Sequence, residues 1–131
     1  MNATVTNFLA VGFGGFVGAV SRYAISGVLQ NRFPGFRPAG TLAVNLSGCL
    51  LIGILMAVVV NRQNFPEILR LFLITGILGS LTTFSTFGYE TVELIREQKI
   101  QLALGNIVSN LLIGFVAVWL GWFGGSWFFG K

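Results

Sequence analysis

The side chains that could do chemistry in this sequence are neutral and polar, and several of them are asparagine or threonine. Asn45 stands inside an apolar run, and Thr41 precedes it by one helical turn on the same face. Asn106 and Asn110 are four residues apart in another apolar run, so they also share a helical face. Each amide carries two N–H donors and a carbonyl acceptor. Such residues either join helices by hydrogen bonds or line a polar path.

A further polar segment, residues 76–87, places two glycines and five hydroxyl side chains within an apolar stretch. Glycine and β-branched threonine weaken a helix, and hydroxyl groups can bond the backbone groups that are freed. We therefore expect an unwound segment near Gly79–Thr82. Non-helical backbone at membrane depth persists where it is buried in protein or lines a polar cavity, and its carbonyls can coordinate a small cation. The alternative is a kink whose hydroxyls bond the preceding turn.

Phe84 and Phe87 are three residues apart, so their rings share a face if a helix resumes after the break. Phenylalanine usually packs in a core or faces lipid, but the edge of its ring is positive. Edges that turn inward would favour a small anion without the deep trap of a buried lysine or arginine, and conduction requires weak binding. Arg22 is either an anchor at the lipid headgroups or a source of positive potential in a vestibule.

Charged residues are few, with eight Lys and Arg and four Asp and Glu, and the chain has no histidine and one cysteine. Glu67 opens the third apolar run, and Glu90, Glu93 and Glu97 crowd its end, so we expect no ionisable group at depth. A proton-coupled transporter usually needs such a group. An enzyme would lack an acid, base or nucleophile pair, and the net charge of +4 indicates arginines near lipid headgroups rather than a nucleic-acid surface.

The elements that must position these residues are apolar runs of membrane length. The chain is 54% hydrophobic and 9% charged, with a mean hydropathy of +0.82, which is typical of a membrane protein. A helix needs roughly 20 residues to cross the hydrocarbon core. We expect one all-α transmembrane domain over residues 1–131, with a third helix broken near its middle. The four predicted spans cover about Val5–Leu29, Ala39–Val60, Ile68–Ile95 and Ile100–Phe123.

An even number of spans puts both termini on one side of the membrane, and the basic residues divide almost evenly between the two sides. The terminal side has Arg62, Arg70 and Lys131, and the other side has Arg32, Arg37, Arg96 and Lys99, with Arg22 near its edge. This positive-inside bias is weak. The chain is therefore a candidate for inserting in both orientations and pairing antiparallel.

Small residues recur every four positions in two of the spans. They are Ala10, Gly14 and Gly18 in the first span and Gly121 and Gly125 near the end of the fourth. Small residues at this spacing let helix backbones approach closely in a membrane, so we expect helix packing at these positions.

The chain resembles the Fluc-type fluoride channels, also called the CrcB family. Three motifs carry the resemblance: residues 14–23, Gly-Gly-Phe-Val-Gly-Ala-Val-Ser-Arg-Tyr; residues 40–48, Gly-Thr-Leu-Ala-Val-Asn-Leu-Ser-Gly; and residues 79–87, Gly-Ser-Leu-Thr-Thr-Phe-Ser-Thr-Phe. The four-span length matches as well, so the resemblance covers essentially the whole chain. Ser80 stands where members often have a second glycine, and Gly114 falls where the polar track often continues with serine.

The resemblance implies a passive fluoride channel of the cell (inner) membrane, built as a dual-topology antiparallel homodimer with two pores. Asn45 would be a pore-lining donor, and Phe84 and Phe87 would turn their ring edges toward fluoride. Backbone carbonyls of Gly79 and Thr82 from both subunits would hold one structural Na⁺ on the twofold axis. The remaining implied pore residues are Thr41, Asn106 and Asn110 along a polar track and Arg22 in the vestibule.

Two other classes of protein stay open as alternatives. A small multidrug-type antiporter has the same size and dual topology, but it requires a carboxylate within the membrane. A non-transporting helical assembly factor would use the polar residues only to join helices. The expected partners are fluoride, membrane lipid and a second copy of the chain, without nucleic acid.

Overall fold

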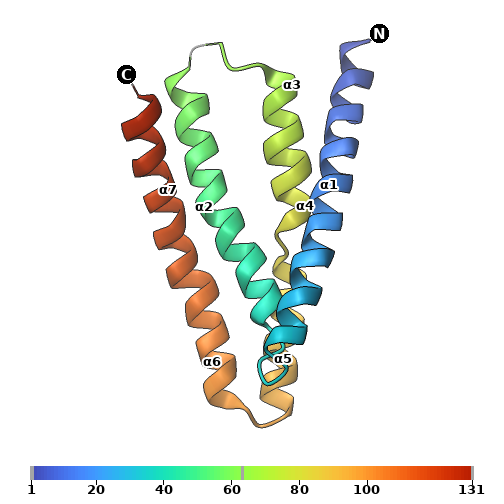
Figure 1. Cartoon of the computed structure of the whole chain (residues 1–131), viewed down its shortest axis with the longest axis vertical. Helices are drawn as coiled ribbons and strands as arrows, with labels where there is room; N and C mark the ends of the chain where they lie inside the picture. The colour runs from blue at the N-terminus through green and yellow to red at the C-terminus, as the bar shows by residue number, and fades with distance from the viewer. Residues whose placement is uncertain (1, 63, 131) are drawn as a thin grey trace.

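The computed structural model describes residues 2–62 and 64–130, and every regular element in these two ranges is helical. The helices form four spans, each long and apolar enough to cross a membrane, as the sequence predicts (Figure 1). In chain order the elements are α1 (Ala3–Arg32), α2 (Ala39–Asn61), α3 (Glu67–Arg70), the π-helix η1 (Leu71–Leu78), α4 (Gly79–Leu81), α5 (Phe84–Arg96), α6 (Ile100–Val108), the π-helix η2 (Ser109–Ile113) and α7 (Gly114–Phe129).

The fourth span is longer than the sequence analysis expected. We placed its end at Phe123, whereas α7 continues to Phe129. Residues 124–126 are Gly-Gly-Ser, which lowers the local hydropathy without ending the helix, because Gly125 packs against Ala57 of α2. The drop in hydropathy after Phe123 therefore marks a change in amino-acid composition and not the end of the helix.

Both termini lie at the end of the molecule that also carries the connection between α2 and α3, at the top of Figure 1. The α1–α2 and α5–α6 connections lie at the opposite end, at the bottom of the same view. This is the arrangement predicted for an even number of spans. Lys131, which the sequence analysis counted on the terminal side, lies outside the described residues.

The residues at the connections explain where the spans begin and end. Pro38 and Pro66 precede α2 and α3 with φ angles of −69° and −59°, values that the proline ring fixes and that suit a helix start. At the other end of the third span, Gln98 adopts a left-handed φ of 61°. The turn it makes lets the Lys99 N–H donate to the Leu94 carbonyl at 2.8 Å, which closes the last turn of α5.

Glycine sets the closest contact between α2 and α7. A Cβ added to Gly121 would overlap the carbonyl oxygen of Leu50, and a Cβ added to Gly53 would overlap that of Val118. The two backbones therefore touch through each other's glycines. Lipid chains are as apolar as leucine, so this close van der Waals contact, and not the exclusion of water, holds the helices together.

The first span packs on the third by the same means. A Cβ added to Gly14 would overlap the Phe72 carbonyl oxygen, and one added to Gly18 would overlap the Ile77 carbonyl oxygen. The close packing predicted at Gly14 and Gly18, and at the glycines of the fourth span, is confirmed.

The third span is broken at its middle, as predicted, but the unwound residues differ from those expected. Gly79, at the start of the expected segment, opens the short helix α4, which ends at Leu81. Thr82 is extended, with φ −84° and ψ 155°, and Thr83 is extended as well, with φ −152° and ψ 117°. The break therefore lies nearer the carboxyl end than the expected segment Gly79–Thr82. The reason is that the backbone of Thr83 is hydrogen-bonded to a side chain of α2.

A single chain buries little apolar surface. The only core cluster among the described residues is formed by Val44, Leu78 and Leu81, where α2 meets the third span. Large apolar side chains are exposed on all four spans, among them Phe13, Phe84, Phe115 and Trp119. Surface of this kind requires lipid or another protein chain as its environment.

Replacement of Gly121 by alanine should destabilise the protein, because the added methyl group meets the Leu50 backbone rather than a flexible side chain. Overpacking of this kind costs about 1–3 kcal/mol. Gly124→Ala is the matched control on the same helix, since a Cβ at Gly124 has no neighbour within 4 Å. Thermal unfolding in detergent should show a lower midpoint for Gly121→Ala only. Equal midpoints for the two variants would contradict the α2–α7 contact.

Candidate functional site

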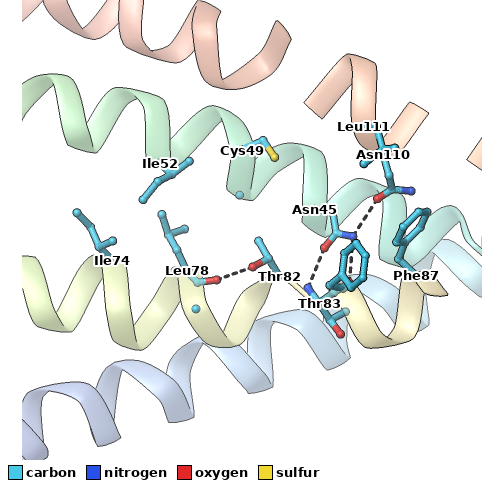
Figure 2. A pocket seen from close by; sticks show the side chains of 13 residues that line it. Asn45, Cys49, Ile52, Ile74, Leu78, Thr82, Thr83, Phe87, Asn110 and Leu111 are labelled. Atoms are coloured by element: carbon cyan, nitrogen blue, oxygen red, sulfur yellow. Dashed lines mark hydrogen bonds between the residues drawn. The ribbon is translucent and has the colours of Figure 1, made fainter. Parts of the chain in front are cut away.

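A chain of hydrogen bonds between neutral side chains joins three of the spans. The Asn45 Nδ2 of α2 donates to the Asn110 Oδ1 of η2 at 2.9 Å (Figure 2). The Asn110 Nδ2 donates in turn to the Oδ1 and the carbonyl oxygen of Asn106, each at 3.0 Å. The Asn106 Nδ2 donates to the Thr91 Oγ1 at 2.9 Å, and Thr91 donates to the Phe87 carbonyl at 2.7 Å. Each side chain in this series therefore donates to the next one, from Asn45 at one end to the Phe87 carbonyl at the other.

Asn106 is the most buried member of this chain, with 0% of its surface exposed. Its spacing of four residues from Asn110 was the sequence signal, and the two side chains are in direct contact, as the shared face predicts. A fully buried amide with all of its partners supplied by protein stabilises the bundle, because any of those partners left alone would be unsatisfied.

Asn45 holds the break in the third span open. Its Oδ1 accepts a hydrogen bond from the Thr83 N–H at 2.8 Å, and its Nδ2 donates to the Thr83 carbonyl at 3.2 Å (Figure 2). The side chain thus satisfies both backbone groups of one extended residue. Since its Nδ2 also donates to Asn110, both amide hydrogens are engaged within the protein.

The same break removes the usual partners of several backbone carbonyls, those of Gly79 and Thr82 among them. In a continuous helix the Gly79 carbonyl would accept from the Thr83 N–H, which here donates to Asn45. The Thr82 carbonyl would accept from the Thr86 N–H, which here donates to the Thr83 Oγ1 at 3.3 Å and caps α5. Gly79 and Thr82, the two residues that the resemblance implies as cation ligands, are therefore among the residues whose carbonyls lose their helical donors, together with Ser80 and Leu81 between them.

Phe84 and Phe87 lie directly after the break, with ring centroids 5.4 Å apart at an angle of 60°. Phe87 is 7% exposed and Phe84 is 77% exposed, so one ring belongs to this chain's interior and the other projects from it. Both line a cavity of about 400 Å³, here called the central cavity, together with Asn45, Thr83 and Asn110 (Figure 2). The predicted aromatic pair thus shares one cavity with two of the three predicted amides, Asn45 and Asn110, whereas Asn106 does not line it.

Arg22 lines a different cavity, of about 250 Å³, which we call the vestibule cavity. Ser26, Thr41, Thr83 and Thr86 line it as well, so hydroxyl groups and one guanidinium face the same space. Thr83 borders both the central cavity and the vestibule cavity. The break in the third span therefore lies between the two cavities.

Thr41 is buried, and its hydroxyl donates to the Oε1 of Glu90 at 2.9 Å. The sequence analysis grouped Glu90 with the glutamates at the end of the third span and expected no ionisable group at depth. Glu90 lies near the end of the third span, as expected, but it is 8% exposed and packs inside the bundle, a burial that the sequence analysis did not predict. A signal was available: Glu90 follows Phe87 by three residues and precedes Leu94 by four, so it lies on the buried face of α5.

The other glutamates near this end of the bundle are tied to cations. The Arg37 Nη1 lies 3.1 Å from the Glu97 Oε1 and 3.6 Å from the Glu93 Oε2. These two ion pairs join the α1–α2 connection to the end of the third span. The hydrogen bond from Lys99 and the charge of Arg37 lower the pKa of Glu97 from its ordinary value. These exposed pairs contribute little to stability, and they leave Glu90 without a cationic partner among the described residues.

Four membrane-length helices around a buried chain of polar side chains define a multi-pass membrane protein. The chain belongs to the family described as "CrcB-like protein, Camphor Resistance (CrcB)", whose sequence profile matches residues 9–122. This confirms the resemblance that the three motifs indicate.

Individual relatives are similar over most of their length. The chain is 44% identical over 113 residues to "Fluoride-specific ion channel FluC 3" of Methanosarcina barkeri, and the matched segment covers 86% of this chain and 85% of the relative. It is 41% identical over 126 residues to "Fluoride-specific ion channel FluC" of Chloroflexus aurantiacus, which covers 92% of this chain and 100% of that protein. A Clostridium perfringens protein of the same name is 44% identical over 113 residues, 86% of this chain and 88% of its own.

Replacement of Asn106 by leucine should lower stability, because the Asn110 amide and the Thr91 hydroxyl each lose a partner in a buried setting. The expected loss is about 1–3 kcal/mol. Gln101→Leu on the exposed face of the same helix is the control. Thermal unfolding in detergent should separate the two variants. A midpoint for Asn106→Leu equal to that of the control would show that the amide chain does not hold the spans together.

Proposed function

We propose that this chain is a fluoride-selective channel that carries fluoride passively out of the cell, with two pores in each antiparallel homodimer in the cell (inner) membrane. The observation that carries the proposal is the run of neutral hydrogen-bonding side chains from Thr83 through Asn45, Asn110 and Asn106 to Thr91, inside an otherwise apolar bundle. The relatives support the choice of ion, since their names specify a fluoride channel.

Neutral donors suit conduction of a small anion. An ion must bind strongly enough to enter the pore and weakly enough to leave it, and a buried lysine or arginine would hold an anion too long. Amide N–H groups and the positive edges of aromatic rings bind an anion more weakly. Arg22 lies outside this inner segment, in the vestibule cavity, where it raises the local concentration of anions.

Asn45 contacts fluoride by exchanging one hydrogen bond for another. Its bonds with Thr83 satisfy the backbone at the break, whereas its bond to Asn110 joins two side chains and satisfies no backbone group. The Asn110 bond is therefore the one that opens when fluoride arrives in the central cavity. A hydrogen bond to an ion is roughly twice as strong as one between neutral groups, which favours the exchange.

The dimer is supported by the exposure of Phe84, one ring of the aromatic pair. Phe84 projects from the chain next to the central cavity, and a lone exposed ring cannot enclose an anion path. A second copy that covers this face would complete the pore with residues of both subunits. The weak charge bias of the connections favours the antiparallel arrangement, and lipid covers the apolar surface that remains.

The carbonyl oxygens of Gly79 and Thr82 fit a structural Na⁺ at the dimer axis. Both have lost their helical donors, and oxygen ligands suit a hard cation. Without a carboxylate in the set, the site is neutral, which favours a monovalent ion. The proposed set takes the carbonyls of Gly79 and Thr82 from each chain, so the partner would supply the other two. The ion would satisfy carbonyls that are otherwise unpaired in a dry interior.

The buried Glu90 is the one observation that favours the antiporter alternative, because proton coupling uses a carboxyl group at depth. The transport assay separates the two functions. A channel releases fluoride from liposomes down its own gradient, whereas an antiporter requires an opposing proton gradient. An assembly factor would release no fluoride under either condition.

Purified protein in liposomes should release fluoride and not chloride, and Asn45→Asp should abolish the release. A fixed negative charge in a low-dielectric path repels an anion strongly. The control is Asn61→Asp, the same substitution at the exposed end of the same helix. Efflux is measured with fluoride- and chloride-selective electrodes. Comparable chloride efflux, or an Asn45→Asp variant as active as the control, would refute the proposed path.

Antiparallel pairing predicts that a single reporter in the α1–α2 connection is accessible from both faces of the membrane. Gly35→Cys places the reporter at an exposed position with open space around it, in a background where Cys49 is replaced by alanine. Membrane-impermeant thiol reagents should label about half of the protein from each side, because the positive-inside bias is weak. Complete labelling from one side alone would exclude dual topology.

A further inference from the structure

Glu90 stands apart from the other glutamates of the described residues because its side chain is buried without an ionic partner. It is 8% exposed, and its Oε1 accepts the hydroxyl of Thr41 at 2.9 Å. Its Oε2 is buried and has no hydrogen-bond partner among the described residues. The side chain lines a cavity of about 400 Å³, here called the Glu90 cavity, to which Gln30 and Thr86 also contribute.

The Glu90 cavity adjoins the proposed ion path. Gln30 and Thr86 line both the Glu90 cavity and the vestibule cavity that contains Arg22. Thr41, the hydrogen-bond partner of Glu90, lines the vestibule cavity as well. An anion beside Arg22 therefore shares the vestibule cavity with Thr41, whose hydroxyl is bonded to Glu90 in the adjoining cavity.

The charged groups around Glu90 are already engaged with one another. Arg37, from the α1–α2 connection, lines the Glu90 cavity but pairs with Glu93 and Glu97. On α5 itself, Tyr89 donates to Glu93 at 2.8 Å. The sequence of α6 contains no charged residue, and α2 presents only the neutral Thr41. No cation in the described ranges therefore forms an ion pair with Glu90.

The two protonation states of a carboxyl group differ in what they offer an anion. A carboxylate accepts hydrogen bonds only, whereas a carboxylic acid has one O–H donor. An ionised Glu90 would bury an unpaired charge at a high energetic cost and would repel fluoride from the path. A neutral Glu90 accepts the Thr41 hydroxyl at Oε1 and keeps a donor at Oε2, the atom that has no partner.

We propose that Glu90 is a further anion-binding residue of the path: held as the neutral carboxylic acid, it turns its Oε2 hydroxyl, which is buried in the conformation described, toward the adjoining cavity and donates one hydrogen bond to the passing ion beside Thr41. This inference rests on the proposed fluoride conduction. The hydrogen stays on Oε2, so no covalent bond forms or breaks and no proton is carried with the ion. The contact also favours fluoride over larger halides, because a compact anion accepts a charge-assisted hydrogen bond more strongly.

The protonation state is tested first, on the reconstituted full chain, by infrared spectroscopy. The carbonyl stretch of a protonated carboxylic acid should be present at neutral pH in the wild type and in Glu93→Gln, and absent from Glu90→Gln. Addition of fluoride should shift this band, and addition of chloride should leave it in place. A band that is absent from the wild type, or that persists in Glu90→Gln, would overturn the proposal.

Fluoride flux through the same preparations tests the donor. Glu90→Gln keeps an N–H donor beside the acceptor oxygen and should retain flux within about threefold of the wild type, whereas Glu90→Ala should lose at least about tenfold, the scale of one hydrogen bond to an ion. Glu93→Gln, which alters an exposed ion pair, should conduct like the wild type. Equal flux in Glu90→Ala and the wild type, or equal losses in the alanine and glutamine variants, would overturn the proposal.

The two measurements keep this inference separate from the proposed function. If the wild type releases no fluoride, the proposed function fails, while the infrared band still reports whether Glu90 is protonated. If the wild type conducts and the Glu90 band is absent, conduction stands and the donor role of Glu90 falls. Flux that depends on the bath cation, with Glu90 ionised, would mean that a bound cation and not a proton neutralises the carboxyl group.

Discussion

The pair of hydrogen bonds between Asn45 and Thr83 is the interaction on which the rest of the site depends. In a membrane an unsatisfied backbone group costs several kcal/mol, so a helix can be interrupted only where another side chain takes over its bonds. Asn45 supplies both an acceptor and a donor to Thr83. The break frees the carbonyls of Gly79 and Thr82 on one side, and on the other it starts the helix that carries Phe84 and Phe87.

The glycines give this site its framework. The first span contacts the third through Gly14 and Gly18, and the second contacts the fourth through Gly53 and Gly121, each at backbone distance. Two tight pairs of helices therefore form, and the polar side chains bridge between them. Gly48 belongs to the same scheme, because a Cβ at that position would overlap the Thr82 methyl group beside the break. The polar network is thus positioned by close backbone contacts at glycines, which carry no side chain of their own.

The sequence predicts the parts of this structure that depend on one segment at a time. The four spans follow from hydropathy and length, and the contact between Asn106 and Asn110 follows from their spacing. The bonds of Asn45 to Thr83 and Asn110 join residues 38 and 65 positions apart, and no periodicity within a helix reveals such a pairing. For this reason the break was expected a few residues too early. Glu90 was missed because its distance from the end of the span suggested an interfacial residue, while its position on the buried face of α5 was the better guide.

The central claim is that fluoride is bound by the Asn45 amide at the break in the third span. Magnetic dipolar coupling between ¹⁹F of the ion and ¹⁵N in the asparagine side chains, measured by solid-state NMR on protein in lipid bilayers, tests this contact directly. The account predicts coupling at hydrogen-bond distance to one asparagine Nδ2, assigned to Asn45 by its loss in an Asn45→Gln sample that conserves the other amides. Coupling that persists in that sample, or no coupling to any asparagine at saturating fluoride, would contradict it.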